Sequence, residues 1–222
     1  MLKKIIKYTL VTLLPKRMWE NRKPYIQFVF RNFENFVILL ISFYYKILNP
    51  KYLFLPYRHT VGLFYLLKVE KILNDLNIEN FITAGALMGA VRQRAFAGRP
   101  NDLDVGIKEC SKEKLELLLK ILKDQNFKIT QLKGNDSWHI RKWFLIDIAI
   151  FRNDNDKYWV HKNSLDVTWK IPYSCLNNLE KINFYDLQFN CPSQKLFLIE
   201  EIYGKEWKIP HKKKQYYFKK TI

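Results

Sequence analysis

The fold of this chain is decided by two neighbouring stretches of sequence, GALMGAVR at residues 85–92 and NDLDVGI at residues 101–107. The first stretch follows the apolar run 81–84, which predicts a buried strand leading through a turn into a short helix. Gly85 and Gly89 at such a turn let backbone N–H groups approach a phosphate, assisted by the helix N-terminus. Glycines four residues apart also occur where helices pack closely, and that alternative stays open.

The second stretch predicts a strand with one acidic face. Side chains alternate between the two faces of a strand. One face therefore carries Leu103, Val105 and Ile107, and the other carries Asp102, Asp104 and Gly106. Two carboxylates this close repel one another unless a cation lies between them, and the glycine leaves space beside them. A divalent ion with oxygen ligands, Mg²⁺ or Mn²⁺, fits the pair. An exposed acidic strand face is the alternative.

A third carboxylate interrupts the apolar run FLIDIAIF at residues 144–151. Alternation along a strand places Asp147 on the face opposite Ile146 and Ile148. Burying an unpaired carboxylate is costly. We therefore expect Asp147 either to ligate a metal or to pair with an Arg or Lys in a structural salt bridge.

These elements follow one another as strand, glycine turn, helix, Asp-x-Asp strand and lone Asp on a later apolar strand. This is the layout of a nucleotidyltransferase-type active site, where three carboxylates hold Mg²⁺ ions that neutralise a phosphoryl group in transfer. We expect an α/β (α+β) fold with a mixed central sheet of that type, flanked by helices. Asp102, Asp104 and Asp147 are the expected catalytic and metal-binding residues.

Basic side chains between the two motifs are candidates for binding substrate. Arginine suits bidentate phosphate binding, so Arg92 and Arg99 are expected to join the Gly85 and Gly89 backbone in holding a diphosphate. Arg94 is expected to be solvated. His139 is either a substrate contact or proton shuttle, or an ordinary polar residue.

The remaining periodicity completes the expected set of elements. Ser111 is a plausible N-cap for one of the helices. Helices are predicted at 61–76, 111–124 and 192–203, and strands at 127–132, 158–170 and 182–189.

Composition limits the classes of function. The chain has 222 residues, 48% of them apolar, which is enough for one substantial domain and excludes global disorder. Lys and Arg number 38 against 21 Asp and Glu, a net charge of +17, so the surface is expected to meet phosphates, nucleic acid or anionic lipid. Three distant cysteines argue against a disulfide framework or zinc ribbon and favour a reducing compartment.

We divide the chain into an N-terminal helical region at 1–56, a catalytic domain at 57–210 and a basic tail at 211–222. The start of the chain lacks the small-residue cleavage site of a secretory signal. Residues 25–48 are interrupted too early for the ~20 apolar residues of a membrane span and predict an amphipathic helix. Its apolar face holds Val29, Phe33, Phe36, Val37, Leu40, Ile41, Tyr44 and Leu48, and its polar stripe holds Arg31, Asn35, Ser42 and Lys46. Such a helix packs on the domain or lies in a membrane interface, and the neighbouring basic residues favour the membrane.

The motifs resemble those of the LicD/fukutin-related phosphotransferases. In that family a Gly-Thr/Ser-Leu-Leu-Gly-x-x-Arg element precedes an Asp-x-Asp element, as residues 85–92 precede 101–106 here. Tyr203-Gly204-x-x-Trp207-x-x-Pro210 is similar to the family's Tyr-Gly-x-x-Trp-x-x-Pro closing element. Two departures stand out: Ala86 replaces the usual hydroxyl residue, and AGRPN at 97–101 replaces the usual Ile-Pro-Trp-Asp.

The resemblance implies transfer of a phospho-alcohol, such as phosphocholine or ribitol phosphate, from a CDP-activated donor to a hydroxyl of a cell-surface glycan, lipopolysaccharide included. We expect a cytoplasmic enzyme held peripherally on an anionic membrane. One alternative is a nucleotidyltransferase that moves NMP from an NTP to a small molecule. The other is a non-enzymatic, basic nucleic-acid-binding protein; the three central carboxylates would repel that ligand, so no nucleic acid is expected.

Overall fold

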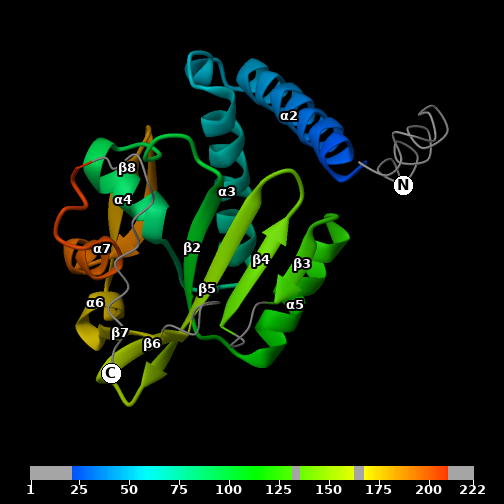
Figure 1. Ribbon diagram of the computed structural model, residues 1–222. Helices are drawn as coiled ribbons and strands as arrows, with labels where there is room; N and C mark the ends of the chain where they lie inside the picture. Colours follow the sequence, from blue (N-terminus) through cyan, green and yellow to red (C-terminus); the bar gives the residue numbers. More distant parts are fainter. Residues whose placement is uncertain (1–21, 132–135, 163–167, 210–222) are drawn as a thin grey trace.

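A mixed sheet forms the centre of the computed structural model (Figure 1). The structure describes residues 22–131, 136–162 and 168–209, with the backbone alone for 22–31. Its strands are β1 (Asn80–Ile82), β2 (Asp102–Lys108), β3 (Lys128–Gln131), β4 (Ser137–Arg141), β5 (Leu145–Asp154), β6 (Tyr158–Lys162), β7 (Thr168–Pro172), β8 (Leu179–Phe184) and β9 (Leu187–Pro192). Its helices are α2 (Arg22–Leu48), η2 (Pro50–Tyr52), α3 (Tyr57–Asp75), α4 (Ala84–Gln93), α5 (Lys112–Asp124), α6 (Tyr173–Asn177) and α7 (Lys195–Tyr203).

The order of strands brings the two acidic motifs side by side. Five strands lie in the order β1-β2-β5-β4-β3, and β6 and β7 extend the sheet from β5. β2 and β5 are parallel, and the other neighbouring strands are antiparallel. The hairpin β8-β9 is a separate sheet that packs beside β1. The predicted α/β fold with a mixed central sheet flanked by helices is confirmed.

The alternation of β2 and β5 sets which face of the sheet is core. Leu103, Val105 and Ile107 are buried, as are Ile146 and Ile148. Gly62 of α3 lies opposite the Leu103 side chain, so α3 covers this face. The other face of β2 meets α4, whose Gly85 amide reaches the Asp104 carboxylate. The acidic motif therefore faces α4, away from the apolar core under α3.

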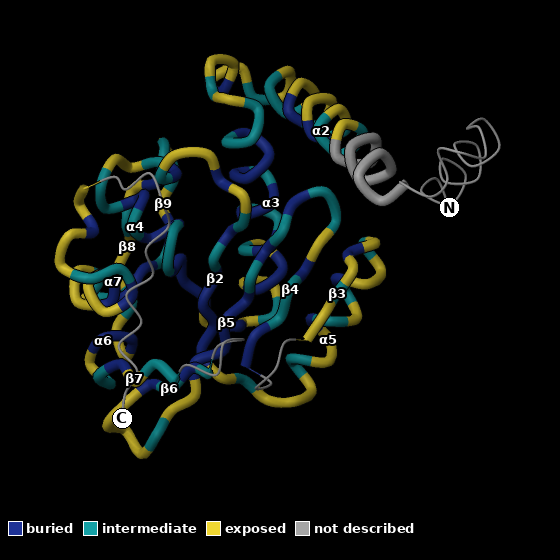
Figure 2. The backbone as a smooth tube through the Cα atoms, viewed as in Figure 1, coloured by how far each residue is buried: buried dark blue, intermediate teal, exposed yellow. Residues whose placement is uncertain are grey.

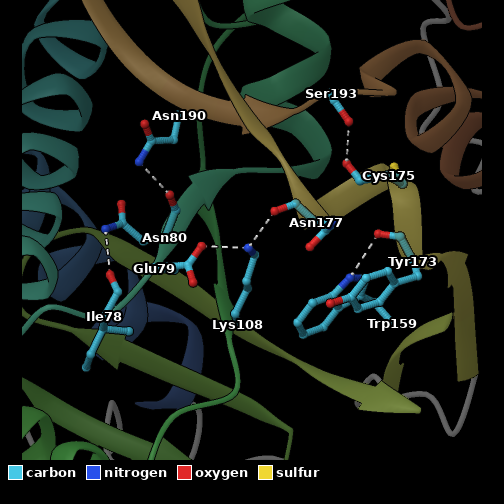
Figure 3. Close-up of polar contacts among 10 residues, drawn as sticks. All are labelled: Ile78, Glu79, Asn80, Lys108, Trp159, Tyr173, Cys175, Asn177, Asn190 and Ser193. Atoms are coloured by element: carbon cyan, nitrogen blue, oxygen red, sulfur yellow. Dashed lines mark hydrogen bonds and ion pairs between the residues drawn. The ribbon is translucent and has the colours of Figure 1, made fainter. Parts of the chain in front are cut away.

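Polar contacts fix β2 at the end opposite Asp102 (Figure 3). Lys108 Nζ donates to Glu79 Oε2 at 2.6 Å and to the Asn177 carbonyl oxygen at 3.2 Å. Asn190 Nδ2 donates to the Asn80 carbonyl oxygen at 2.9 Å, which ties β9 to β1. These bonds hold β1, β2, β9 and the end of α6 together, so the acidic end of β2 projects from a fixed frame.

The helix predicted in the N-terminal region packs along α3 (Figure 1). Ile38 and Ser42 are buried at this contact, and the Tyr45 and Phe64 rings meet edge to face at 5.1 Å. Arg58 Nη2 donates to Asn35 Oδ1 at 3.1 Å. Asn35 and Ser42 of the predicted polar stripe therefore lie against the domain. Of the predicted apolar face, Ile41 also packs on the core, so the buried side is rotated from the predicted one.

Much of the predicted apolar face of α2 is left uncovered in the described structure. Phe36, Leu40, Tyr44 and Leu48 are each more than half exposed, and Figure 2 shows the described part of α2 largely as exposed or intermediate residues. Among the described helices, not one combines the length and hydropathy that crossing a bilayer requires. Residues 1–21, the basic tail 211–222 and the side chains of Val29 and Arg31 lie outside the described residues.

Candidate active site

A row of polar side chains crosses three strands at one end of the sheet. Asp104 of β2 is in register with Asp147 of the parallel strand β5. Asp147 is in turn opposite His139 of the antiparallel strand β4. Residues in register on neighbouring strands project from the same face. The two carboxylates and the imidazole therefore lie next to one another on the face that meets α4.

The next register row, toward the end of the sheet, adds a charge of each sign. Asp102 is in register with Leu145, and Leu145 is opposite Arg141. Asp102 lies two residues before Asp104, and Arg141 lies two residues after His139, so both project from the polar face. The three expected carboxylates thus lie in two adjacent register rows on one face of the sheet, with a guanidinium two strands from Asp102.

Burial sets the electrostatics of Asp147. Its side chain is 36% exposed, and that of His139 is 35% exposed, with 3.5 Å between His139 Nε2 and Asp147 Oδ2. Burial raises the pKa of Asp147 above its ordinary value; His139 acts to lower that pKa and Asp102 to raise it. Asp147 Oδ1 is buried and has no hydrogen-bond partner in the described residues. A cation or a proton bound at Asp147 Oδ1 would therefore satisfy a buried carboxylate oxygen.

The first turn of α4 is tied to the acidic strand. The Gly85 amide donates to Asp104 Oδ2 at 2.9 Å, and the Thr83 amide donates to the Asp104 carbonyl oxygen at 3.2 Å. A Cβ at Gly85 would lie 3.1 Å from Asp104 Oδ2 and 3.7 Å from Tyr203 Oη. The α4 N-terminus, with its partial positive charge, thus lies beside Asp104, and Tyr203 of the closing motif reaches the same place from α7.

The structure gives Gly89 a packing role. It lies in the second turn of α4, where amides are bonded within the helix. A Cβ there would lie 2.3 Å from the Ala95 carbonyl oxygen and 2.6 Å from the Ala97 nitrogen. Only glycine lets the chain after α4 fold back this closely. The close-packing alternative thus describes Gly89, whereas Gly85 lies at the site itself.

The candidate arginines are at different distances from the carboxylates. Arg92 is seven residues after Gly85, on the same side of α4 and about 10 Å further along its axis. Arg99 is exposed in the loop before β2, where its Nη2 donates to Tyr57 Oη at 3.0 Å. Arg94, expected to be solvated, is exposed and ends α4 in a left-handed conformation. The contacts of the described residues do not bring Arg92 or Arg99 onto the carboxylates.

The expected space beside Gly106 is filled by protein. Gly106 is paired with Phe81 of β1, and a Cβ at Gly106 would lie 2.3 Å from the Phe81 ring. The glycine therefore makes room for an aromatic ring and leaves none for a cation. The expectation failed because the sequence does not show which residue lies opposite Gly106.

The carboxylates fit a divalent cation that completes its shell from a substrate. Asp104 and Asp147 offer hard oxygen ligands in one register row, and Asp147 Oδ1 is unsatisfied. Within the described ranges, no group of three or more His, Cys, Asp or Glu is already gathered around a metal position. Mg²⁺ is usually held by one or two carboxylates together with waters and substrate phosphates. Two carboxylates with a third nearby satisfy that requirement.

Of two further polar groups at the site, the sequence analysis left the role of one open and missed the other. His139 was left between two readings because β4 was not predicted; the alternation of Trp138 and Ile140 with His139 and Arg141 was the available signal. Thr83 precedes α4, and its buried Oγ1 has no hydrogen-bond partner in the described residues. No motif marked Thr83, because its place is set by the pairing of β1 with β2.

Comparison with known proteins gives a family and distant structural likenesses. The model for the LicD/FKTN/FKRP nucleotidyltransferase domain matches residues 77–194. No curated protein matches the chain. The lincomycin-bound crystal structure of the lincosamide antibiotic adenylyltransferase LnuA is 15% identical, with a TM-score of 0.45 over 62% of this chain and 82% of that one. The crystal structure of ANT(2'')-Ia with adenylyl-2''-tobramycin is 10% identical, with a TM-score of 0.44 over 60% and 70%.

A nucleotidyltransferase-like antigenic protein from Paracoccidioides brasiliensis is 16% identical, with a TM-score of 0.35 over 60% of each chain. Likeness at this level says nothing of the substrate. The family model, in contrast, spans more than half of the chain, including both Asp102-x-Asp104 and Asp147. The chain therefore belongs to the LicD/FKTN/FKRP family of nucleotidyltransferase-type transferase domains.

Proposed function

We propose that this protein transfers a phospho-alcohol from a CDP-activated donor to a glycan hydroxyl, with Mg²⁺ or Mn²⁺ bound at Asp102, Asp104 and Asp147. Family membership supports a transferase. The observation that carries the proposal is the register pairing of Asp104 with Asp147 beside the N-terminus of α4. This arrangement suits a metal-bound diphosphate. The two carboxylates bind the metal cation, and the partial positive charge of the helix N-terminus attracts the phosphate anion.

The reaction needs one bond made and one bond broken at phosphorus. The glycan oxygen attacks the phosphorus nearer the alcohol, the bond from that phosphorus to the bridging oxygen breaks, and CMP leaves. The proton of the attacking hydroxyl goes to Asp147, whose Oδ1 has no hydrogen-bond partner among the described residues. A bound divalent ion would neutralise charge on the transferring phosphoryl group.

The neighbouring groups have supporting roles in this proposal. His139, 3.5 Å from Asp147 Oδ2, orients that carboxylate and shares its proton. The Gly85 amide fixes Asp104. Arg92, Arg99 and Arg141 are the guanidinium groups near this end of the sheet, and they would contact phosphate oxygens as the donor binds.

Product analysis tests the proposal. The protein would be incubated with Mg²⁺, a mixture of glycan acceptors and either CDP-choline, CDP-ribitol or the four NTPs. Release of CMP with formation of a phosphodiester is the expected result. Pyrophosphate released from an NTP, with no CMP from any CDP-alcohol, would instead identify a nucleotidyltransferase.

A separate measurement tests the alternative that this is a non-enzymatic nucleic-acid-binding protein. A basic nucleic-acid-binding protein would bind DNA or RNA with a steep salt dependence. Tight, salt-sensitive binding together with no turnover of any donor would overturn the proposal. Weak binding that leaves CMP release unchanged is the expected result, because the carboxylates repel nucleic acid at the centre of the domain.

A further inference from the structure

The side of α2 that faces away from α3 carries large apolar side chains between residues 36 and 48, and Lys46 is the one charged residue in that stretch. Six of them, which we call the apolar face, are 51–64% exposed. The apolar face consists of Phe36, Leu39, Leu40, Phe43, Tyr44 and Ile47. Monomeric soluble proteins seldom expose a contiguous apolar patch of this kind unless it binds something. The opposite side of α2 is already buried on α3 through Ile38 and Ser42, so the elements described here leave the apolar face uncovered.

The turn after α2 also exposes large apolar side chains. Phe54 is 95% exposed and Leu53 is 54% exposed. Phe54 is an aromatic side chain held almost entirely in water, where it contributes nothing to the packing of the domain. Side chains of this type at the end of an amphipathic helix suit the boundary between lipid head groups and acyl chains.

The charge around the apolar face indicates which surface covers it. From Asn35 to Val69 the sequence contains no Asp or Glu, whereas it contains Lys46, Lys51, Arg58 and Lys68. Of these, Lys51 pairs with Asp186, and Arg58 bonds to Asn35 at the contact between α2 and α3. Residues 1–58 as a whole carry eleven Lys or Arg and two Asp or Glu. Basic residues flanking an apolar helix face attract an anionic lipid surface, whereas a second copy of this chain would bring the same positive charge.

The position of α2 relates this surface to the acidic site. Phe33 of α2 meets Trp143 edge to face at 6.2 Å, and Trp143 lies two residues before the start of β5. Arg99 in the loop before β2 bonds to Tyr57 at the start of α3. In Figure 1, α2 lies over the same end of the sheet from which β2 and β5 begin.

We infer that the apolar face of α2, with Phe54, docks this protein on an anionic lipid bilayer. The helix lies in the interface with its Ile38 side still packed on α3. Docking in this way holds the end of the sheet that carries Asp102 and Asp147 close to the lipid surface. The inference goes beyond the proposed reaction and does not depend on it, since it uses none of the catalytic residues.

Vesicle binding tests this inference on the full chain. A triple variant, Leu39→Ser, Phe43→Ser and Ile47→Ser, removes the centre of the apolar face and leaves Ile38 and Ser42 in place. The matched control is Leu117→Ser, since Leu117 is an exposed leucine on α5. Binding would be measured by flotation with phosphatidylglycerol–phosphatidylcholine vesicles and with phosphatidylcholine vesicles alone.

We expect the wild type and the control to float with the anionic vesicles and much less with neutral ones. The triple variant should partition at least about tenfold less, because the loss of apolar contact weakens insertion, with its unfolding temperature unchanged. Equal flotation of the triple variant and the wild type would overturn the inference. A clear fall in the unfolding temperature of the triple variant would also overturn the inference, and so would self-association of the wild type through this face without lipid. Either result would show that protein, and not lipid, covers the apolar face.

Discussion

At the level of the single residue, Asp104 accepts a hydrogen bond from the Gly85 amide, and in the proposed reaction it would also offer oxygen to a cation. An asparagine at this position can still accept the amide hydrogen bond, but it cannot supply the negative charge. We therefore expect Asp104→Asn to fold normally and to lose at least about 100-fold in turnover, since charge stabilisation by a metal is worth several kcal/mol. CMP release measures the loss.

The control for this prediction is Asp124→Asn. Asp124 is an exposed carboxylate at the end of α5, far in sequence from the site motifs. Its variant should turn over at the wild-type rate. If Asp104→Asn also kept that rate, Asp104 would not be part of the catalytic machinery.

His161 gives the folded state a pH dependence of its own. It is buried, with Nδ1 at 3.0 Å from the Ile150 carbonyl oxygen and Nε2 at 3.5 Å from Ser137 Oγ. Burial lowers the pKa of His161 below its ordinary value of 6.5. Between the lowered folded value and 6.5 the unfolded chain binds more protons, so stability rises with pH and is lost as pH falls through this window.

We predict that His161→Gln reduces the fall in unfolding temperature between pH 7.5 and pH 5.5. We expect the variant to be less stable at pH 7.5, because it loses the ring contacts of His161 with Phe151 and Trp169 and its fitted hydrogen bond to the Ile150 carbonyl. His59, whose pKa is also lowered by burial, remains in both proteins, so the test is the difference between them. The same pH dependence in both would show that His161 titrates alike in the folded and unfolded chain.

The two glycines of α4 are expected to respond differently to alanine. Gly89→Ala places a methyl group 2.3 Å from backbone oxygen and should cost about 1–3 kcal/mol of unfolding free energy. Gly85→Ala places its methyl 3.1 Å from the Asp104 carboxylate, and the effect should fall mainly on CMP release. Denaturant unfolding and turnover separate the two. Equal losses of stability would mean that both glycines serve packing alone.

At the level of secondary structure, the sequence predicted helix α5 and strands β1, β2, β3 and β5, but it missed β4. It was wrong at 158–170 and 182–189, each predicted as one strand, because each stretch covers parts of two antiparallel strands. The α5 helix has Leu118 and Leu122 on one buried side and Ser111 as its N-cap, whose Oγ accepts from the Lys114 amide. β4 is only five residues long and begins after the undescribed residues 132–135. Its alternation was too brief to identify, so His139 could not be placed opposite Asp147.

The sequence also did not show which strands pair with one another or which side of a helix packs on the domain. Alternation correctly put Asp102 and Asp104 on one face, since that depends only on the period of a strand. It could not show that Phe81 fills the space at Gly106, because that depends on the register of β1 with β2. For α2 the sequence predicted an amphipathic helix, but it did not show that the side with Ile38 and Ser42 packs on α3.

The packing of α2 leads to a prediction for this element. Ile38 is 3% exposed and Phe43 is 64% exposed on the same helix. Ile38→Asp buries a charge against α3 and should cost about 2–4 kcal/mol of unfolding free energy. Phe43→Asp faces solvent and should change it by less than about 0.5 kcal/mol. Chemical denaturation of both variants checks this, and similar losses would contradict the packing described here.

Across the whole molecule, the net charge of +17 contrasts with the three carboxylates at one end of the sheet. A positive net charge attracts phosphate-bearing ligands. In the proposed reaction the carboxylates would repel an anion that arrives without a cation, so we expect a metal-bound diphosphate to bind better than a bare polyanion. This expectation agrees with membership of a nucleotidyltransferase-type family.

The most direct test of the central claim is CMP release from a CDP-alcohol. It would be measured with Mg²⁺ and again with EDTA, for the wild type, Asp104→Asn, Asp147→Asn and Asp124→Asn. The account predicts that the wild type and Asp124→Asn release CMP only with Mg²⁺, and that the other two variants release almost none while remaining folded. CMP release by Asp104→Asn and Asp147→Asn at the wild-type rate, or wild-type release unaffected by EDTA, would contradict it.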